Sequence, residues 1–127
     1  MDIDIKALSN EYSDKHILVI GDIVLDAYIY GEIDRISQEA PVPIVTINYK
    51  DYKPGGAANV AMNLAALGMN VTLSGITGND DANDQISHML KKYGIDFQVI
   101  IDPKIRTTTK LDKIKPTNIS IIISNWQ

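Results

Sequence analysis

Cysteine is absent from this sequence of 127 residues, and aromatic side chains are few, with one Phe and one Trp. The lack of cysteine excludes disulfides, thiolate metal sites and cysteine nucleophiles, and it agrees with a reducing cytosol. Long apolar runs are also missing, because ILVI and III are far too short to span a bilayer. The first residues show no basic stretch followed by an apolar one, so no secretory signal is visible. We therefore expect a soluble, cytoplasmic protein.

An excess of positive charge is missing too, since the formal net charge is -4. Nucleic-acid binding therefore has no electrostatic support, and we expect neither a nucleic-acid nor a membrane partner. Hydrophobic residues make up 45% and charged residues 22%, which is typical of a folded protein rather than a disordered one. The length fits a single domain.

The hydrophobic pattern alternates between strands and helices. The run HILVIGD predicts a first strand that is covered on both faces, and the β-branched and aromatic alternation of residues 27–53 predicts an inserted β segment. Further strands are expected at 70–78 and 95–101, another extended piece at 106–114, and helices at 57–67 and 81–93. This order predicts an α/β fold with a parallel sheet flanked by helices. Three parallel strands would leave at least one side uncovered, so the domain is expected to be incomplete.

Spacings of three and four residues predict which helix faces are buried. In the first of the two helices the expected buried residues are Val60, Leu64 and Leu67. In the second helix, which Asp80 is expected to cap, they are Ile86, Met89, Leu90 and Tyr93.

Candidate ligand-binding residues gather where the first strand and the first helix are expected to meet. Asp22 and Asp26 follow the strand, and Gly55 and Gly56 precede the helix, so all four can converge at one edge of the sheet. A helix N-terminus offers unpaired amide donors, and glycine lets a ligand approach that backbone closely. Asp22 fits a second interpretation equally well, as a residue that bonds the turn at the end of the strand.

Asn59 and Asn63 are four residues apart and share one face of that helix. An amide side chain both donates and accepts hydrogen bonds, as a sugar hydroxyl does, so Asn59 with Asp26 would suit a polyol. For Asn63, bracing of a neighbouring loop is as good an interpretation as ligand contact. His16 and His88 have no companion at metal-ligand spacing, and we expect no metal site.

The segment PGGAANVAMNLAALGMNVTLSGITGNDDA resembles the first signature of the ribokinase-like (PfkB) carbohydrate kinases. VIGDIVLDAY is similar to the family's first strand, whose sugar-binding aspartate falls on Asp26. The resemblance runs from about residue 17 to residue 110. It implies a ribokinase-like sheet with a small β lid, which the insertion at about 27–53 would supply, and a fragment from the N-terminal part of one such domain.

A closer resemblance is to the kinases of D-glycero-D-manno-heptose 7-phosphate in ADP-heptose and lipopolysaccharide core biosynthesis. GEIDRISQEAPVPIV is similar to their lid, and TTTKL to a following strand. This likeness implies that Asp26, Gly55, Gly56 and Asn59 hold sugar hydroxyls. It makes Arg35 and Lys110 candidates for the sugar phosphate, although both also fit surface charges on a lid strand. The lid of this family commonly pairs with that of a second subunit, which implies a homodimer.

The resemblance also implies parts that this sequence does not contain. The complete kinases use ATP and Mg²⁺, with a glycine-rich anion hole and an aspartate base in a C-terminal half, and no GAGD-like motif occurs here. The tail at about 111–127 departs from the family pattern, which leads to the hypothesis of a truncated or frameshifted reading frame. We expect no catalytic residue and no complete ATP site in this chain, and no kinase turnover from it alone. The alternatives are a fragment of another sugar kinase of the family and a non-catalytic sugar-binding remnant.

Overall fold

The computed structural model describes residues 4–115, without the side chains of 33–35, 43, 45 and 112–115. Most of the predicted divergent tail therefore lies outside the described residues. The chain divides into two compact units, one made of residues 1–25 and 53–108 and the other of residues 26–52 with those from 109 onward. No helix in the described part is both long enough and apolar enough to cross a membrane.

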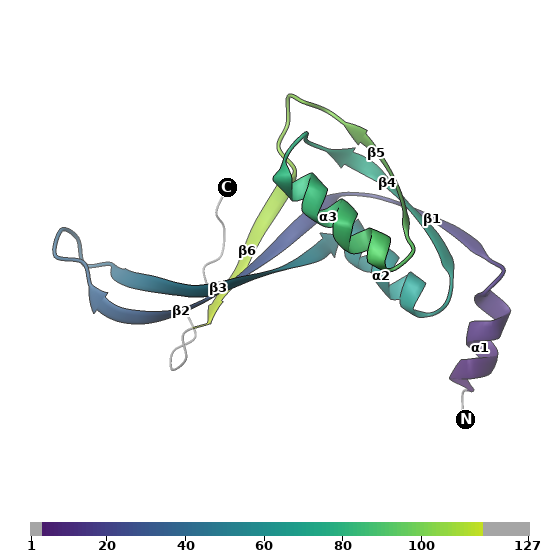
Figure 1. Cartoon of the computed structure of the whole chain (residues 1–127), viewed down its shortest axis with the longest axis horizontal. Coiled ribbons are helices and arrows are strands. Elements are labelled where there is room, and N and C mark those ends of the chain that lie inside the picture. Colours follow the sequence, from purple (N-terminus) through teal and green to yellow (C-terminus); the bar gives the residue numbers. More distant parts are fainter. Residues whose placement is uncertain (1–3, 116–127) are drawn as a thin grey trace. The chain divides into compact units, whose positions relative to one another are not determined.

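The first unit contains a parallel three-stranded sheet with strand order β1-β4-β5 (Figure 1). The helices and strands of the first unit are α1 (Ile5–Tyr12), β1 (His16–Ile20), α2 (Ala57–Ala66), β4 (Asn70–Thr77), α3 (Asp81–Lys92) and β5 (Asp96–Ile101). Ile17 is paired with Val71, and Leu73 with Phe97. The predicted parallel α/β arrangement is confirmed.

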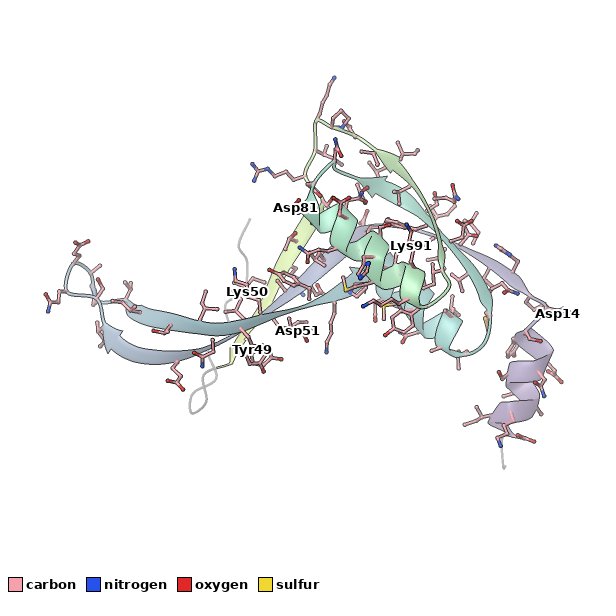
Figure 2. The ribbon with its side chains drawn as sticks, in the orientation of Figure 1. Asp14, Tyr49, Lys50, Asp51, Asp81 and Lys91 are labelled. Atoms are coloured by element: carbon pink, nitrogen blue, oxygen red, sulfur yellow. The ribbon has the colours of Figure 1, made fainter. Side chains whose placement is uncertain are left out.

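Helices α2 and α3 pack on one face of this sheet, where the core lies (Figure 1). Val71 and Leu73 of β4 are buried there, together with Ile86 and Leu90 of α3. Charges at the ends of α3 suit the helix dipole: Asp81 and Asp84 lie in the first turn, and Lys91 and Lys92 in the last. Figure 2 shows Asp81 and Lys91 at these opposite ends.

The predicted buried face of α2 is wrong at Val60 and Leu67, whereas the third predicted residue, Leu64, is half-buried. Val60 is 49% exposed and Leu67 51% exposed, whereas Ala58 and Ala61 are completely buried. Small side chains bring a helix close to a sheet, so α2 packs through its alanines and turns its larger residues outward. Tyr93 is also 52% exposed, because it is the C-cap of α3 and no longer follows the helical stripe of Ile86 and Leu90.

The opposite face of the sheet is open among the described residues. Side chains there alternate with the buried ones, and the large apolar members are Leu18 and Ile20 of β1, Ile76 of β4 and Ile100 of β5, all exposed. His16 Nε2 lies 2.8 Å from Thr72 Oγ1 on the same face. The expectation that the first strand is covered on both faces is therefore wrong, whereas the uncovered side expected of a three-stranded sheet is present.

The remaining strands form a second sheet in the order β3-β2-β6. They are β2 (Ile23–Ile36), β3 (Pro43–Gly56) and β6 (Thr108–Lys115). Strands β2 and β3 form a long hairpin (Figure 1), at whose end the Ser37 N–H donates to the Val42 carbonyl oxygen at 2.8 Å. The rings of Tyr30 and Tyr49 stack across it with centroids 4.3 Å apart. Extended structure was expected in these segments and is present.

Candidate functional site

An open cavity of about 540 Å³ lies in the first unit, where β1 and β4 end. Its wall is mostly apolar, and Asp22 and Thr108 are the lining residues that have polar side chains. The other lining residues are Ile20, Gly21, Ile23, Val24, Gly75, Ile76 and Ile105. A mainly apolar wall with a few polar groups is typical of small-molecule sites, and the carboxyl edge of a parallel sheet is the usual place for one.

The start of α2 is joined to this cavity wall by a turn that only glycine can form. Gly56, the N-cap of α2, has φ 56° and ψ -132°. A Cβ at this position would collide with the carbonyl oxygen of Asp22 and would lie 3.2 Å from Val24 Cγ2. The Ala57 N–H donates to that same Asp22 carbonyl oxygen at 2.8 Å. Gly56 therefore lies close to the end of the first strand, as predicted. Gly55, which directly precedes Gly56 in the chain, is buried.

Because Gly56 has no side chain, the first turn of α2 has no side-chain cap. Its remaining amide donors and the partial positive charge of the helix end are therefore left for solvent or an oxygen-rich ligand. This is the arrangement that the two glycines predict.

Asn59 and Asn63 lie one turn apart on α2, and both are exposed. Within residues 4–115 neither side-chain amide makes a hydrogen bond to a neighbouring loop. An amide of this kind is accessible to a ligand. The bracing role considered for Asn63 finds no partner among the described residues, and ligand contact by either asparagine stays a prediction.

Asp22 takes part in the turn through its backbone, not its side chain. Its carbonyl oxygen accepts the Ala57 hydrogen bond, while Asp22 as a residue is exposed and lines the cavity. The turn interpretation of Asp22 therefore applies to its carbonyl oxygen, and ligand contact by its side chain stays a prediction.

Asp26, Arg35 and Lys110 belong to the second unit. Asp26 and Arg35 lie on β2 and Lys110 lies on the neighbouring strand β6. Asp26 is half-buried and Lys110 is exposed, and each interacts with other residues of the chain. The side chain of Arg35 lies outside the described residues. The convergence of these three residues with those of α2 stays a prediction.

Sequence reasoning missed the part of the cavity wall that β4 and the chain before β6 provide. Gly75 had a usable signal, because a glycine inside a strand often marks a close approach of another backbone. A Cβ there would lie 2.6 Å from the Gly21 carbonyl oxygen and 2.7 Å from Ile23 Cδ1. Ile105 and Thr108 had no such signal. Among the described residues, no cluster of three or more His, Cys, Asp or Glu side chains could hold a metal ion.

Comparison with known proteins identifies the family. The pfkB family carbohydrate kinase model matches residues 14–127. This chain belongs to the pfkB family of carbohydrate kinases. Among curated relatives, the chain is 42% identical over 112 residues to the bifunctional protein HldE of Caulobacter vibrioides, covering 87% of this chain and 23% of that protein. It is 50% identical over 95 residues to HldE of Photorhabdus laumondii, covering 75% of this chain and 20% of that protein.

Solved structures support the fold of this pfkB-family chain. A carbohydrate kinase from Agrobacterium tumefaciens superposes with a TM-score of 0.62 at 20% identity, covering 86% of this chain and 35% of that one. The tetrameric inhibited form of phosphofructokinase-2 from Escherichia coli gives a TM-score of 0.63 at 18% identity, covering 87% of this chain and 34% of that one. The pfkB-family chain thus spans about a fifth of the curated relatives and about a third of these kinases.

Proposed function

We propose that this chain is the sugar-binding part of an ATP-dependent kinase that acts on a sugar phosphate in the cytoplasm. D-glycero-D-manno-heptose 7-phosphate, on the route to ADP-heptose and the lipopolysaccharide core, is the first substrate to test. The pfkB family supports the reaction class. Identities of 42% and 50% to HldE proteins support the choice of that branch over other sugar kinases.

The observation that carries the proposal is the uncapped start of α2 beside the cavity at Asp22. Exposed Asn59 offers one donor and one acceptor to a sugar hydroxyl, and the carboxylate of Asp22 accepts from another. Amide donors of the first turn of α2 favour oxygen atoms with negative charge. In this proposal Asp26 adds a second carboxylate, and Arg35 and Lys110 hold the phosphate of the sugar.

Kinases of this family take the transferred phosphoryl group from ATP with Mg²⁺. Among the described residues there is no group of three or more His, Cys, Asp or Glu side chains that could hold a metal ion by itself. We assign the nucleotide, the metal and the catalytic base to the part of the family domain that this chain does not span. The chain alone is therefore expected to bind sugar phosphate without turning it over.

A thermal-shift titration with heptose 7-phosphate, fructose 6-phosphate and ribose tests the proposal, because a ligand that binds only the folded state raises its melting temperature. Heptose 7-phosphate should give the largest shift. Asn59→Ala should abolish the shift, whereas Asn10→Ala, which changes an exposed asparagine on α1, should keep it. An equal shift in both variants would show that the sugar binds elsewhere, and the absence of any shift in the unmodified chain would refute the proposal.

The second unit supports a further part of the proposal, a homodimer formed through the β2–β3 hairpin. Its exposed apolar residues are Ile36, Val42, Ile47 and Tyr49. Figure 2 shows Tyr49 on this hairpin. Sedimentation analysis of Ile47→Lys should show a monomer where the unmodified chain is a dimer. A monomeric unmodified chain would contradict this part alone.

One observation favours a second candidate function, a non-catalytic remnant that associates with other chains. The open sheet face carries large apolar side chains, and exposed patches of that kind promote association. A chain that melts without a cooperative transition and gains no stability from any of the three sugars would support this candidate over the kinase fragment.

A further inference from the structure

A hydrogen-bonded cluster joins the end of β4, the start of α3 and the loop that follows β5. We call it the Asp80 clamp and define it as Thr77, Gly78, Asp80, Asn83 and Thr107. Asp80 Oδ1 accepts from the Asn83 N–H at 3.0 Å, and Asp80 Oδ2 accepts from the Thr107 N–H at 2.7 Å. Thr107 Oγ1 accepts from the Gly78 N–H at 3.0 Å, and the Thr77 hydroxyl donates to Asn83 Oδ1 at 2.9 Å.

Asp80 itself is half-buried, and the polar side chains around it in the clamp are buried and paired. Thr77, Asn83 and Thr107 are the buried polar residues of the described core, and no buried side-chain nitrogen or oxygen among the described residues lacks a partner. Burial raises the pKa of the Asp80 carboxyl, but hydrogen bonds from Thr107 and Asn83 and the nearby charge of Arg106 outweigh it, so this pKa lies below its ordinary value. Asp80 is thus held as a carboxylate.

The clamp contains more than a helix cap requires. One carboxylate oxygen is enough to cap α3, and Oδ1 does so through the Asn83 N–H. The second oxygen holds a residue 27 positions away in the chain. Gly78 leaves room for this contact, since a Cβ there would collide with the Ile105 carbonyl oxygen and lie 2.7 Å from Asp80 Oδ2.

The loop held in this way forms one side of the cavity. Its first residue is fixed as well, because the Asp102 N–H donates to the Thr77 carbonyl oxygen at 2.9 Å. Ile105 and Thr108, on either side of the clamped Thr107, both line the cavity that Asp22 also lines. A shift of Thr107 would therefore move both of these wall residues.

We propose that Asp80 is a positioning residue of the sugar-phosphate site, which holds the lining residues Ile105 and Thr108 in place at the cavity through Thr107. This inference rests on the proposed function for its ligand, a polyhydroxylated phosphate ester. The geometry of the clamp itself does not depend on that function.

The substitution Asp80→Asn keeps the helix-capping bond to the Asn83 N–H and removes the bond to the Thr107 N–H. Asparagine caps a helix as well as aspartate does, so Oδ1 can still accept from Asn83. The amide nitrogen that replaces Oδ2 cannot accept from Thr107, and a buried donor is left without a partner. The matched control is Asn83→Ala, which removes the partner of the Thr77 hydroxyl and leaves both oxygen atoms of Asp80 in use.

Two measurements on the whole chain test the proposal. Amide hydrogen exchange of residues 105–108 should become about tenfold faster in Asp80→Asn and stay within about twofold in Asn83→Ala, as loss of a charge-assisted hydrogen bond requires. The Kd for heptose 7-phosphate, from thermal titration, should weaken about tenfold in Asp80→Asn only. Should Asp80→Asn fail to fold, Thr107→Val replaces it: the backbone N–H that donates to Asp80 stays, but the hydroxyl that accepts from the Gly78 N–H is removed, so the same loop is loosened through the other bond of Thr107.

Equal effects of Asp80→Asn and Asn83→Ala on the Kd would overturn the proposal, because the cluster would then contribute to stability alone. Unchanged exchange at residues 105–108 in Asp80→Asn would overturn it too. If heptose 7-phosphate does not bind the unmodified chain while exchange still rises in Asp80→Asn, the proposed function fails and the positioning of the cavity wall stands.

Discussion

Replacement of Gly56 by alanine tests the turn that joins α2 to the cavity. Gly56 combines a positive φ of 56° with a ψ of -132°, a backbone conformation that residues with a side chain rarely adopt. The new Cβ would also point into the carbonyl oxygen of Asp22. This oxygen accepts the hydrogen bond from the Ala57 N–H, so it cannot move away without losing that bond.

The expected loss of stability follows from these two effects. A non-glycine residue held in such a backbone conformation costs about 1–3 kcal/mol. Loss or distortion of the Ala57–Asp22 hydrogen bond adds about 0.5–1.5 kcal/mol. The free energy of unfolding should therefore fall by about 1.5–4.5 kcal/mol, which is a large part of the roughly 5–15 kcal/mol typical of a domain.

Urea unfolding of the chain measures this loss, and Gly94→Ala is the matched control. Gly94 also has a positive φ, 69°, but a Cβ there meets nothing within 4 Å. Its loss should be limited to the backbone term of about 1–2 kcal/mol. If the two variants lose the same amount, contact with Asp22 contributes nothing, and the description of the turn as a close approach of two backbones is refuted.

The remaining predictions concern the clamp, the hairpin and the two faces of the sheet. Since the folded-state pKa of Asp80 is lowered, its stabilising contribution is complete above the unfolded-state pKa and is lost as pH falls through the folded-state pKa. The urea midpoint should therefore fall more steeply for the unmodified chain than for Asp80→Asn between neutral pH and about pH 3. Parallel curves for the two proteins would contradict this. A double-mutant cycle on Tyr30 and Tyr49 should give a coupling of about 0.5–1.5 kcal/mol in thermal unfolding, and a value of zero would exclude a stabilising ring contact. Leu73→Ala should lower the free energy of unfolding by about 2–5 kcal/mol. Ile100→Thr on the open face should change it by no more than about 0.5 kcal/mol and should reduce association in sedimentation runs. Similar losses of stability in both variants would mean that the open face is covered.

Local patterns predicted the elements of the fold well. The apolar run of β1, the two glycines before α2 and the capping Asp80 before α3 all mark features that neighbouring residues determine. Burial was less predictable, because it depends on what packs against each element. The apolar stripe of Val60 and Leu67 looked like a core face, but the alanines of α2 make the closer contact with the sheet.

In the candidate site too, features set by neighbouring residues could be predicted from the sequence, and contacts between residues far apart in the chain could not. Gly56 and Asn59 could be selected as candidates from the sequence, because a glycine before a helix and an amide in its first turn are local signals. The contact of Asp80 with Thr107 could not, since it joins residues 27 positions apart and the first of them already had an adequate explanation as a cap. When one role already explains a residue such as Asp80, the sequence gives no indication that the residue has a second role.

The packing of α2 also indicates how its specificity could be engineered. Ala58 and Ala61 have no exposed surface, while Asn59 and Asn63 between and beyond them are open to solvent. A randomised library at positions 59 and 63 would therefore change the side chains that the proposed site offers to a sugar, at little cost in folding. Larger side chains at positions 58 and 61 would prevent the close packing of α2 on the sheet. Most variants of a library at those two positions would therefore fail to fold and could not be screened for sugar binding.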